Sequence, residues 1–87
     1  MEKIYHFIAI GGVGMSGLAK YLLEDGHTVS GSDIAESKYI DKLRKLGAEV
    51  SIGHSADNVP EDAVVIVLEL LDVSAQVYVA LPSASIV

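Results

Sequence analysis

Blocks of hydrophobic residues, separated by polar and glycine-rich stretches, divide the chain into expected strands and helices. Residues 4–10 form a nearly continuous apolar run, which is typical of a parallel strand buried on both faces. Apolar residues then recur at helical spacing, at Met15, Leu18, Ala19, Leu22 and Leu23. The pattern predicts a strand followed by a helix that packs on the sheet and stops at Gly26.

The same alternation continues to about residue 68. Strands are predicted at 27–33, 48–52 and 63–68. Between the first two lies a second helix, with Ser37 as a candidate cap and Gly47 at its end. Its predicted apolar face consists of Tyr39, Ile40, Leu43 and Leu46.

The last twenty residues are less regular. Residues 68–75 fit either an extension of the fourth strand or a short helix, and residues 76–81 resemble a strand. Pro82 limits that strand to an edge or an end. Because the connection is short for a crossover helix, an antiparallel hairpin is an alternative. We therefore expect a single α/β domain over residues 1–87, a small Rossmann-like three-layer parallel sheet with β-α-β-α-β-β order and an open assignment for the last strand.

A glycine-rich turn joins the first strand to the first helix. Residues 12–17 fit the G-x-G-x-x-G spacing, and Asp33 follows Gly12 by 21 residues. The first glycine allows a tight turn, the second lets a phosphate approach the backbone, and the third, Gly17, is expected to let the helix pack closely on the sheet. Free N–H groups at the helix N-terminus would then face an anion.

Several polar residues are candidates for ligand contacts, each with a structural alternative. Asp33 would accept hydrogen bonds from a ribose or base, or would act as a turn or cap residue. The Ser16 hydroxyl would meet a phosphate or satisfy the first helical turn. His54 and Asn58 lie in a polar loop that follows the third strand and that would reach a ligand. For His6 we expect a structural role, and the alternative is a position near the mouth of the site.

Composition narrows the function classes. The chain has 87 residues, a net charge of −6, 51% hydrophobic residues and no cysteine. The acidic charge and the lack of a basic stripe argue against nucleic acid and anionic membranes. The brief apolar run at the start is no signal peptide, and no stretch reaches the ~20 apolar residues of a membrane-spanning helix. We expect a cytoplasmic protein without a metal site or a nucleophile–base pair.

Four linked motifs resemble the opening of the UDP-N-acetylmuramate–L-alanine ligases, in the Mur ligase family. They are the stretch 6–19, the Val29-Ser30-Gly31-Ser32-Asp33 strand end, Leu46-Gly47-Ala48, and the Gly53-His54 loop through Asn58. The resemblance covers about residues 6–66 and is more specific than a glycine signature alone. Residues 66–87 form a divergent tail.

The resemblance implies an N-terminal domain that binds the UDP part of UDP-N-acetylmuramate. The glycine loop of the family faces the diphosphate, and the strand-end acid and the loop His and Asn lie near the uridine. In this sequence the implied UDP-binding residues are Gly11, Gly12, Val13, Gly14, Met15, Ser16, Asp33, His54 and Asn58.

The complete family enzyme uses ATP and Mg²⁺ to join L-alanine to the muramyl carboxylate, in a central domain that follows this one. This chain has no G-x-x-x-x-G-K-[S/T] phosphate loop, so we expect it to bind a substrate without catalysing the reaction and without a cofactor of its own. It also departs from the family pattern, with Ile40 where a Thr is frequent and without a Ser-Ser-Ala motif after the fourth strand.

Two other interpretations stay open. One is a stand-alone module for NAD or another nucleotide, because Asp33 would suit a ribose 2′-OH equally well. The other is a truncated or remodelled half-fold without a function. An incomplete sheet also predicts a homodimer through an uncovered edge or face.

Overall fold

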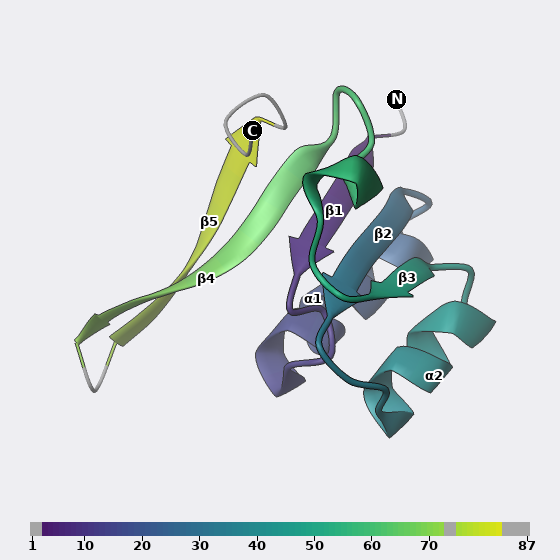
Figure 1. Ribbon diagram of the computed structural model, residues 1–87, viewed down its shortest axis with the longest axis horizontal. Helices are drawn as coiled ribbons and strands as arrows, with labels where there is room; N and C mark the ends of the chain where they lie inside the picture. The colour runs from purple at the N-terminus through teal and green to yellow at the C-terminus, as the bar shows by residue number, and fades with distance from the viewer. Residues whose placement is uncertain (1–2, 73–74, 83–87) are drawn as a thin grey trace.

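The structure is a computed structural model that describes residues 3–72 and 75–82. Within them, five strands form one sheet in the order β3-β2-β1-β4-β5 (Figure 1). The strands β1 to β4 run parallel, and β5 runs antiparallel to β4. Their bounds are Ile4–Ile8 for β1, Thr28–Asp33 for β2, Glu49–Ile52 for β3, Val64–Asp72 for β4 and Ala75–Pro82 for β5. The expected Rossmann-like α/β class is confirmed.

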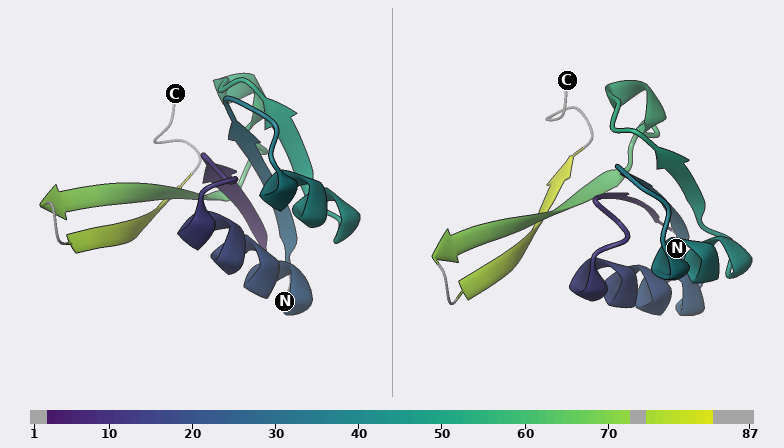
Figure 2. Two further views of the ribbon diagram at one scale, coloured as in Figure 1. Left: turned by 90° about the horizontal axis from the view of Figure 1, so that it is seen from below. Right: turned by 60° about the horizontal axis from the view of Figure 1, so that its bottom comes forward.

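Different structures cover the two faces of the sheet. The helices α1 (Val13–Glu24) and α2 (Lys38–Lys45) lie together on one face, as Figure 2 shows. The connection 53–63, which contains the 3₁₀ helix η1 (Ala56–Asn58), crosses the opposite face (Figures 1 and 2). The three layers are therefore the two helices, the sheet and this connection. We call the two sides of the sheet the helix face and the loop face.

The helix face carries the hydrophobic core. Side chains alternate along a strand, so Phe7 and Val29 face the helices while their neighbours face the other way. The buried cluster consists of Phe7, Ile10, Met15, Ala19, Leu22, Val29, Ile40, Leu43, Ala48 and Ile66. Leu46, expected on the apolar face of α2, is instead 47% exposed.

The loop face buries polar side chains near its centre. His6 and Ser32 are each 1% exposed, Ser30 is 7% exposed, and the apolar Val65 on β4 is fully buried. His6 stands opposite Ser30 in the parallel register of β1 and β2. The connection that crosses this face therefore lies over hydrogen-bonding groups as well as the apolar Val65.

Strand β1 ends two residues earlier than the apolar run suggests. Ala9 has a φ of 62°, in the left-handed region, and this turns the chain out of the strand. Ile10 nevertheless stays with the sheet, because its N–H donates to the Ser32 carbonyl at 3.0 Å. Its side chain enters the core over Gly31, where an added Cβ would lie 2.7 Å from Ile10 Cδ1 and 2.9 Å from the Phe7 carbonyl oxygen.

This close approach corrects the role assigned to Gly17. A Cβ at Gly17 would meet no atom within 4 Å, so the residue does not serve close packing of α1 on the sheet. Gly31 is the glycine whose missing side chain the core requires. The expectation was wrong because the glycine spacing identifies the turn but does not determine which face of the helix its third member occupies.

The helix boundaries follow the local signals. Ser37 caps α2, since its hydroxyl accepts the Ile40 N–H at 3.3 Å, and this confirms the expected cap. Gly26 and Gly47 have φ values of +89° and +108°, as expected of residues that follow helix ends.

The tail forms the antiparallel hairpin. Strand β4 continues to Asp72, and β5 returns beside it so that Pro82 pairs with Val64 at the end of the edge strand. The expected extension of the fourth strand is thus correct as far as Asp72. Residues 73–74 and the residues after Pro82 lie outside the described residues.

Candidate functional site

The glycine turn opens onto the N-terminus of α1. Gly12 caps the helix in an extended conformation, without a side-chain hydrogen bond. The first bond of the helix runs from the Ser16 N–H to the Gly12 carbonyl, at 2.7 Å. The N–H groups of residues 13–15 therefore have no acceptor within the helix. This end of α1 is exposed at Gly12, Val13 and Gly14, so an anion can reach the backbone N–H groups there.

Asp33, at the end of β2, ties the glycine turn to the sheet. Its Oδ2 accepts the Gly11 N–H at 2.8 Å, and its Oδ1 accepts the Ile34 N–H at 2.7 Å. A Cβ at Gly11 would lie 2.7 Å from the same Oδ2, so only glycine fits there without a shift. The Gly11 N–H is thus already bonded, whereas each carboxylate oxygen of Asp33 keeps a lone pair for a ligand hydroxyl.

Ser16 and Met15 contribute differently from the exposed glycines. The Ser16 hydroxyl donates to the Val13 carbonyl at 3.0 Å and the residue is only 8% exposed, which is the arrangement expected if it satisfies the first helical turn. Met15 packs in the core, 2% exposed. Its side chain is therefore a core group, and only its backbone N–H belongs to the open end of α1.

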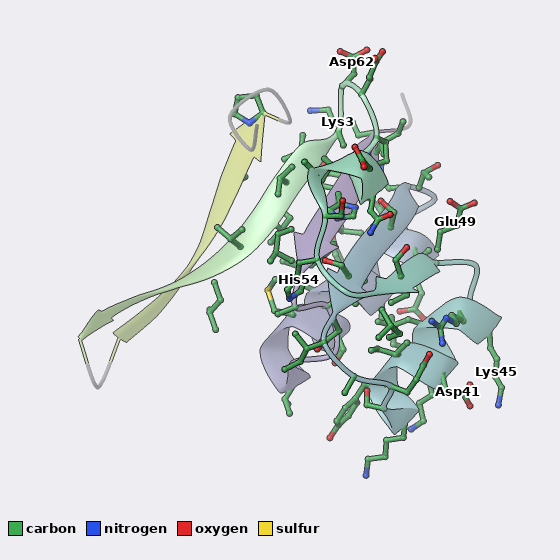
Figure 3. The ribbon with its side chains drawn as sticks, in the orientation of Figure 1. Lys3, Asp41, Lys45, Glu49, His54 and Asp62 are labelled. Carbon is green, nitrogen blue, oxygen red and sulfur yellow. The ribbon has the colours of Figure 1, made fainter. Side chains whose placement is uncertain are left out.

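The loop after β3 brings His54 to the same edge. The Gly53 N–H donates to the Asp33 carbonyl at 2.7 Å, which holds the start of the loop beside the end of β2. His54 is exposed, and its Nδ1 lies 2.6 Å from the Ser32 hydroxyl. Figure 3 shows His54 near the glycine-turn end of the sheet, with Lys3 and Asp62 at the opposite end.

Asn58 is placed less directly. It lies on η1, and its Nδ2 donates back to the Gly53 carbonyl at 3.4 Å. The structure thus brings the glycine turn, Asp33 and His54 to one edge, whereas the Asn58 side chain supports the loop. The roles of all nine predicted residues in binding UDP stay predictions.

Two Ser–His pairs occupy the loop face, and sequence reasoning missed the serines. Besides Ser32 and His54, Ser30 Oγ lies 2.8 Å from Nδ1 of the buried His6. The signal was available, because Ser30 and Ser32 alternate with Gly31 at the two-residue period of a strand with one polar face.

His6 is enclosed, as the structural interpretation predicted. Its Nε2 is buried without a hydrogen-bond partner. Burial, and to a lesser extent the neighbouring His54, lower the pKa of the His6 imidazole from its usual 6.5. His6 is therefore neutral at pH 7, so no charge is buried under the connection.

A separate groove of about 260 Å³ runs between the two helices. Its lining includes Val13, Lys20 and Lys42. Within the described residues no group of three or more His, Cys, Asp or Glu side chains converges as a metal site would require. None of the helices in that part of the chain is both long and apolar enough to cross a membrane.

Comparison with known proteins agrees with this arrangement. Residues 4–81 match the family model described as "Mur ligase family, catalytic domain", which extends past the 6–66 resemblance into the tail. The chain is 54% identical over 61 residues to a UDP-N-acetylmuramate–L-alanine ligase of Sulfurihydrogenibium, covering 70% of this chain and 13% of the relative. It is 52% identical over 67 residues to the same-named ligase of Pelobacter propionicus, covering 77% and 14%.

A solved structure supports the fold. A murein peptide ligase, Mpl, from Psychrobacter arcticus matches with a TM-score of 0.69 and 25% identity, over 84% of this chain and 16% of that one. The chain therefore spans about one seventh of the length of these relatives. The family match covers most of the chain, and the chain belongs to the Mur ligase family.

Proposed function

We propose that this chain binds the UDP moiety of UDP-N-acetylmuramate as the N-terminal domain of an ATP-dependent ligase that adds L-alanine in peptidoglycan synthesis. The observation that carries the proposal is the open N-terminus of α1 beside Asp33 and His54. Two relatives, 54% identical over 61 residues and 52% identical over 67 residues, are named UDP-N-acetylmuramate–L-alanine ligases.

The anion would be held by the backbone rather than by cations. Three amides at residues 13–15 lack helical acceptors, and the helix dipole adds a partial positive charge of about +0.5 at this end. This suits an acidic chain of net charge −6. The Gly11 N–H, engaged by Asp33, would stabilise the turn and leave the diphosphate to the next residues.

The nucleoside would lie toward β2 and the following loop. Asp33 keeps lone pairs that can accept ribose or base donors, and His54 has a ring nitrogen, Nε2, beyond the one that meets Ser32. Ile34 and Ile52, 77% and 45% exposed, supply apolar surface at the same edge for a base or ribose.

Catalysis would need other parts of a longer protein. ATP and Mg²⁺ are expected to bind outside this segment, because the chain contains no P-loop sequence. The substrate is a cytoplasmic precursor in the proposed reaction, which makes a cytoplasmic location part of the same proposal.

Ligand-induced stabilisation tests the proposal. The melting temperature of the chain should be measured with UDP-N-acetylmuramate, UDP, NAD and ATP at matched concentrations. A ligand that binds the native state raises stability by RT ln(1 + [L]/Kd), about 2.7 kcal/mol at one hundred times Kd. We expect stabilisation by the two uridine nucleotides alone.

Each other outcome has a distinct meaning. Stabilisation by NAD alone would replace the proposal with a dinucleotide module that uses Asp33 for a ribose hydroxyl. No effect from any of the four would indicate a half-fold that has kept the family structure without its binding site.

A further inference from the structure

We propose that Ser32 is a positioning residue for nucleotide binding, because it holds the His54 ring against the sheet with the opposite ring nitrogen turned to the ligand. The inference rests on the proposed function and adds a residue, buried at the end of β2, that itself need not touch the nucleotide.

Within the described part of the chain, the Ser32–His54 pair is one of two contacts that attach the loop 53–58 to the sheet. The Asp57 N–H donates to Ser55 Oγ, the Asn58 N–H donates to the Ser55 carbonyl, and the Asn58 side chain returns to Gly53. All of these close within residues 53–58 and shape the loop without attaching it to the sheet. The attachment comes from the Gly53 backbone bond to Asp33 and from the contact of 2.6 Å between His54 Nδ1 and Ser32 Oγ.

The burial of Ser32 determines the side from which its hydroxyl contacts the His54 ring. Ser32 is 1% exposed whereas His54 is exposed, so the hydroxyl approaches the ring from the protein side only. A histidine whose Nδ1 is engaged presents Nε2 in a defined direction, and the hydrogen bond at one nitrogen determines the proton state of the other. Without the hydroxyl, the ring would rotate in solvent and lose the ordering before binding.

The neighbouring pair offers a matched control. Ser30 is also buried, also lies on the loop face of β2, and also contacts a histidine Nδ1, at 2.8 Å. Its partner, His6, is enclosed in the sheet and not exposed to a ligand. Removal of either hydroxyl therefore deletes a hydrogen bond between a buried serine and a histidine, but only the Ser32 bond ends on a residue at the proposed site.

The test compares Ser32→Ala and Ser30→Ala by titration with UDP and by the ¹⁵N chemical shifts of the His54 ring in the free protein. Ser32→Ala should weaken UDP binding about tenfold, equivalent to about 1.4 kcal/mol, and should alter the His54 tautomer populations. Ser30→Ala should leave UDP affinity within about twofold, and should change the His54 ring shifts less than Ser32→Ala does, because it keeps the bond to His54 Nδ1.

A double-mutant cycle separates positioning from general loosening of the fold. In a His54→Ala background, Ser32→Ala should cost no further UDP affinity, because the residue through which it acts is already gone. An equal loss in both backgrounds would overturn the proposal. Should Ser32→Ala not fold, Ser32→Thr, which retains the hydroxyl, carries the same two readouts and should keep the His54 tautomer of the unmodified chain.

Failure of the proposed function would be distinguishable. If the unmodified chain does not bind UDP, the His54 ring shifts of the free protein still show whether Ser32 positions that ring. Unchanged His54 shifts in Ser32→Ala would refute a positioning role, whereas changed shifts would retain that role for a different ligand.

Discussion

The centres of the two sheet faces are both buried, but the side chains buried there differ in chemistry. Adjacent residues of β1 illustrate the difference, since Phe7 is fully buried under the helices and His6 is 1% exposed under the connection 53–63. On β2, Val29 belongs to the core whereas Ser30 and Ser32 meet histidines. The helix face provides the burial that stabilises the fold, and the loop face connects the sheet to the proposed site.

Burial alone therefore does not identify the hydrophobic core. Apolar burial contributes roughly 25 cal/mol per Å² without directional requirements. A buried polar layer instead needs its partners in place, and each lost bond leaves a desolvated group. The loop face is therefore expected to contribute less stability and more orientation than the helix face.

The largest loss of stability is expected at Phe7, and its neighbour His6, on the opposite face, provides the comparison. Phe7→Ala should lower the free energy of unfolding by about 3–5 kcal/mol, through lost burial and a cavity. His6→Ala should cost only about 1–2 kcal/mol, because it also removes the unpartnered Nε2. Urea denaturation monitored by circular dichroism measures both, and equal losses would contradict the difference between the faces.

Two glycine substitutions test whether close packing at β2 and open space at α1 affect stability in opposite ways. Gly31→Ala would force a Cβ to 2.9 Å from the Phe7 carbonyl, and should destabilise the protein by about 1–3 kcal/mol. Gly17→Ala lies in α1 with open space around it and should stabilise by about 0.5–1 kcal/mol. Thermal melts of the two variants should therefore shift in opposite directions.

The loop face should also make stability depend on pH. The His6 pKa in the folded protein is lowered from 6.5, so below that pH the unfolded chain binds more protons than the folded one. The free energy of unfolding should therefore be at its full value above pH 6.5 and fall as the pH decreases below it. His6→Ala should reduce this slope in denaturation curves collected between pH 5 and 8, and an unchanged slope would assign it to other groups.

The smallest effect concerns the sheet edge. The homodimer stays a prediction, and β5 is where it would form, because this strand is last in the sheet order and its segment from Ala75 to Pro82 contains no charged residue. Light scattering should show weak association that Val79→Lys reduces. If the chain is instead a monomer, Val79→Lys will leave the mass measured by light scattering unchanged, and this result would contradict the prediction.

Much of the fold was predictable because its signals are local. The apolar run of β1, the cap Ser37 and the glycines at 26 and 47 each determine a boundary through nearby backbone chemistry. The early end of β1 was not predictable, since the apolar run does not indicate the left-handed φ of Ala9, and Ile10 packs over Gly31, which is distant in sequence.

The candidate site was predictable in its members but not in its bonds. The sequence places Gly11 and Asp33 at adjacent strand ends, yet only the structure shows that the carboxylate already takes the Gly11 N–H. The serines of β2 were missed because their role depends on histidines 24 and 22 residues away.

The most direct test of the proposed site is an NMR titration of the ¹⁵N-labelled chain with UDP. Saturable shifts should concentrate at the amides of residues 11–16, at Asp33 and in the loop 53–58. Shifts confined instead to the groove between α1 and α2, around Lys20 and Lys42, or the absence of any saturable shift, would contradict the assignment of this edge as the nucleotide-binding site.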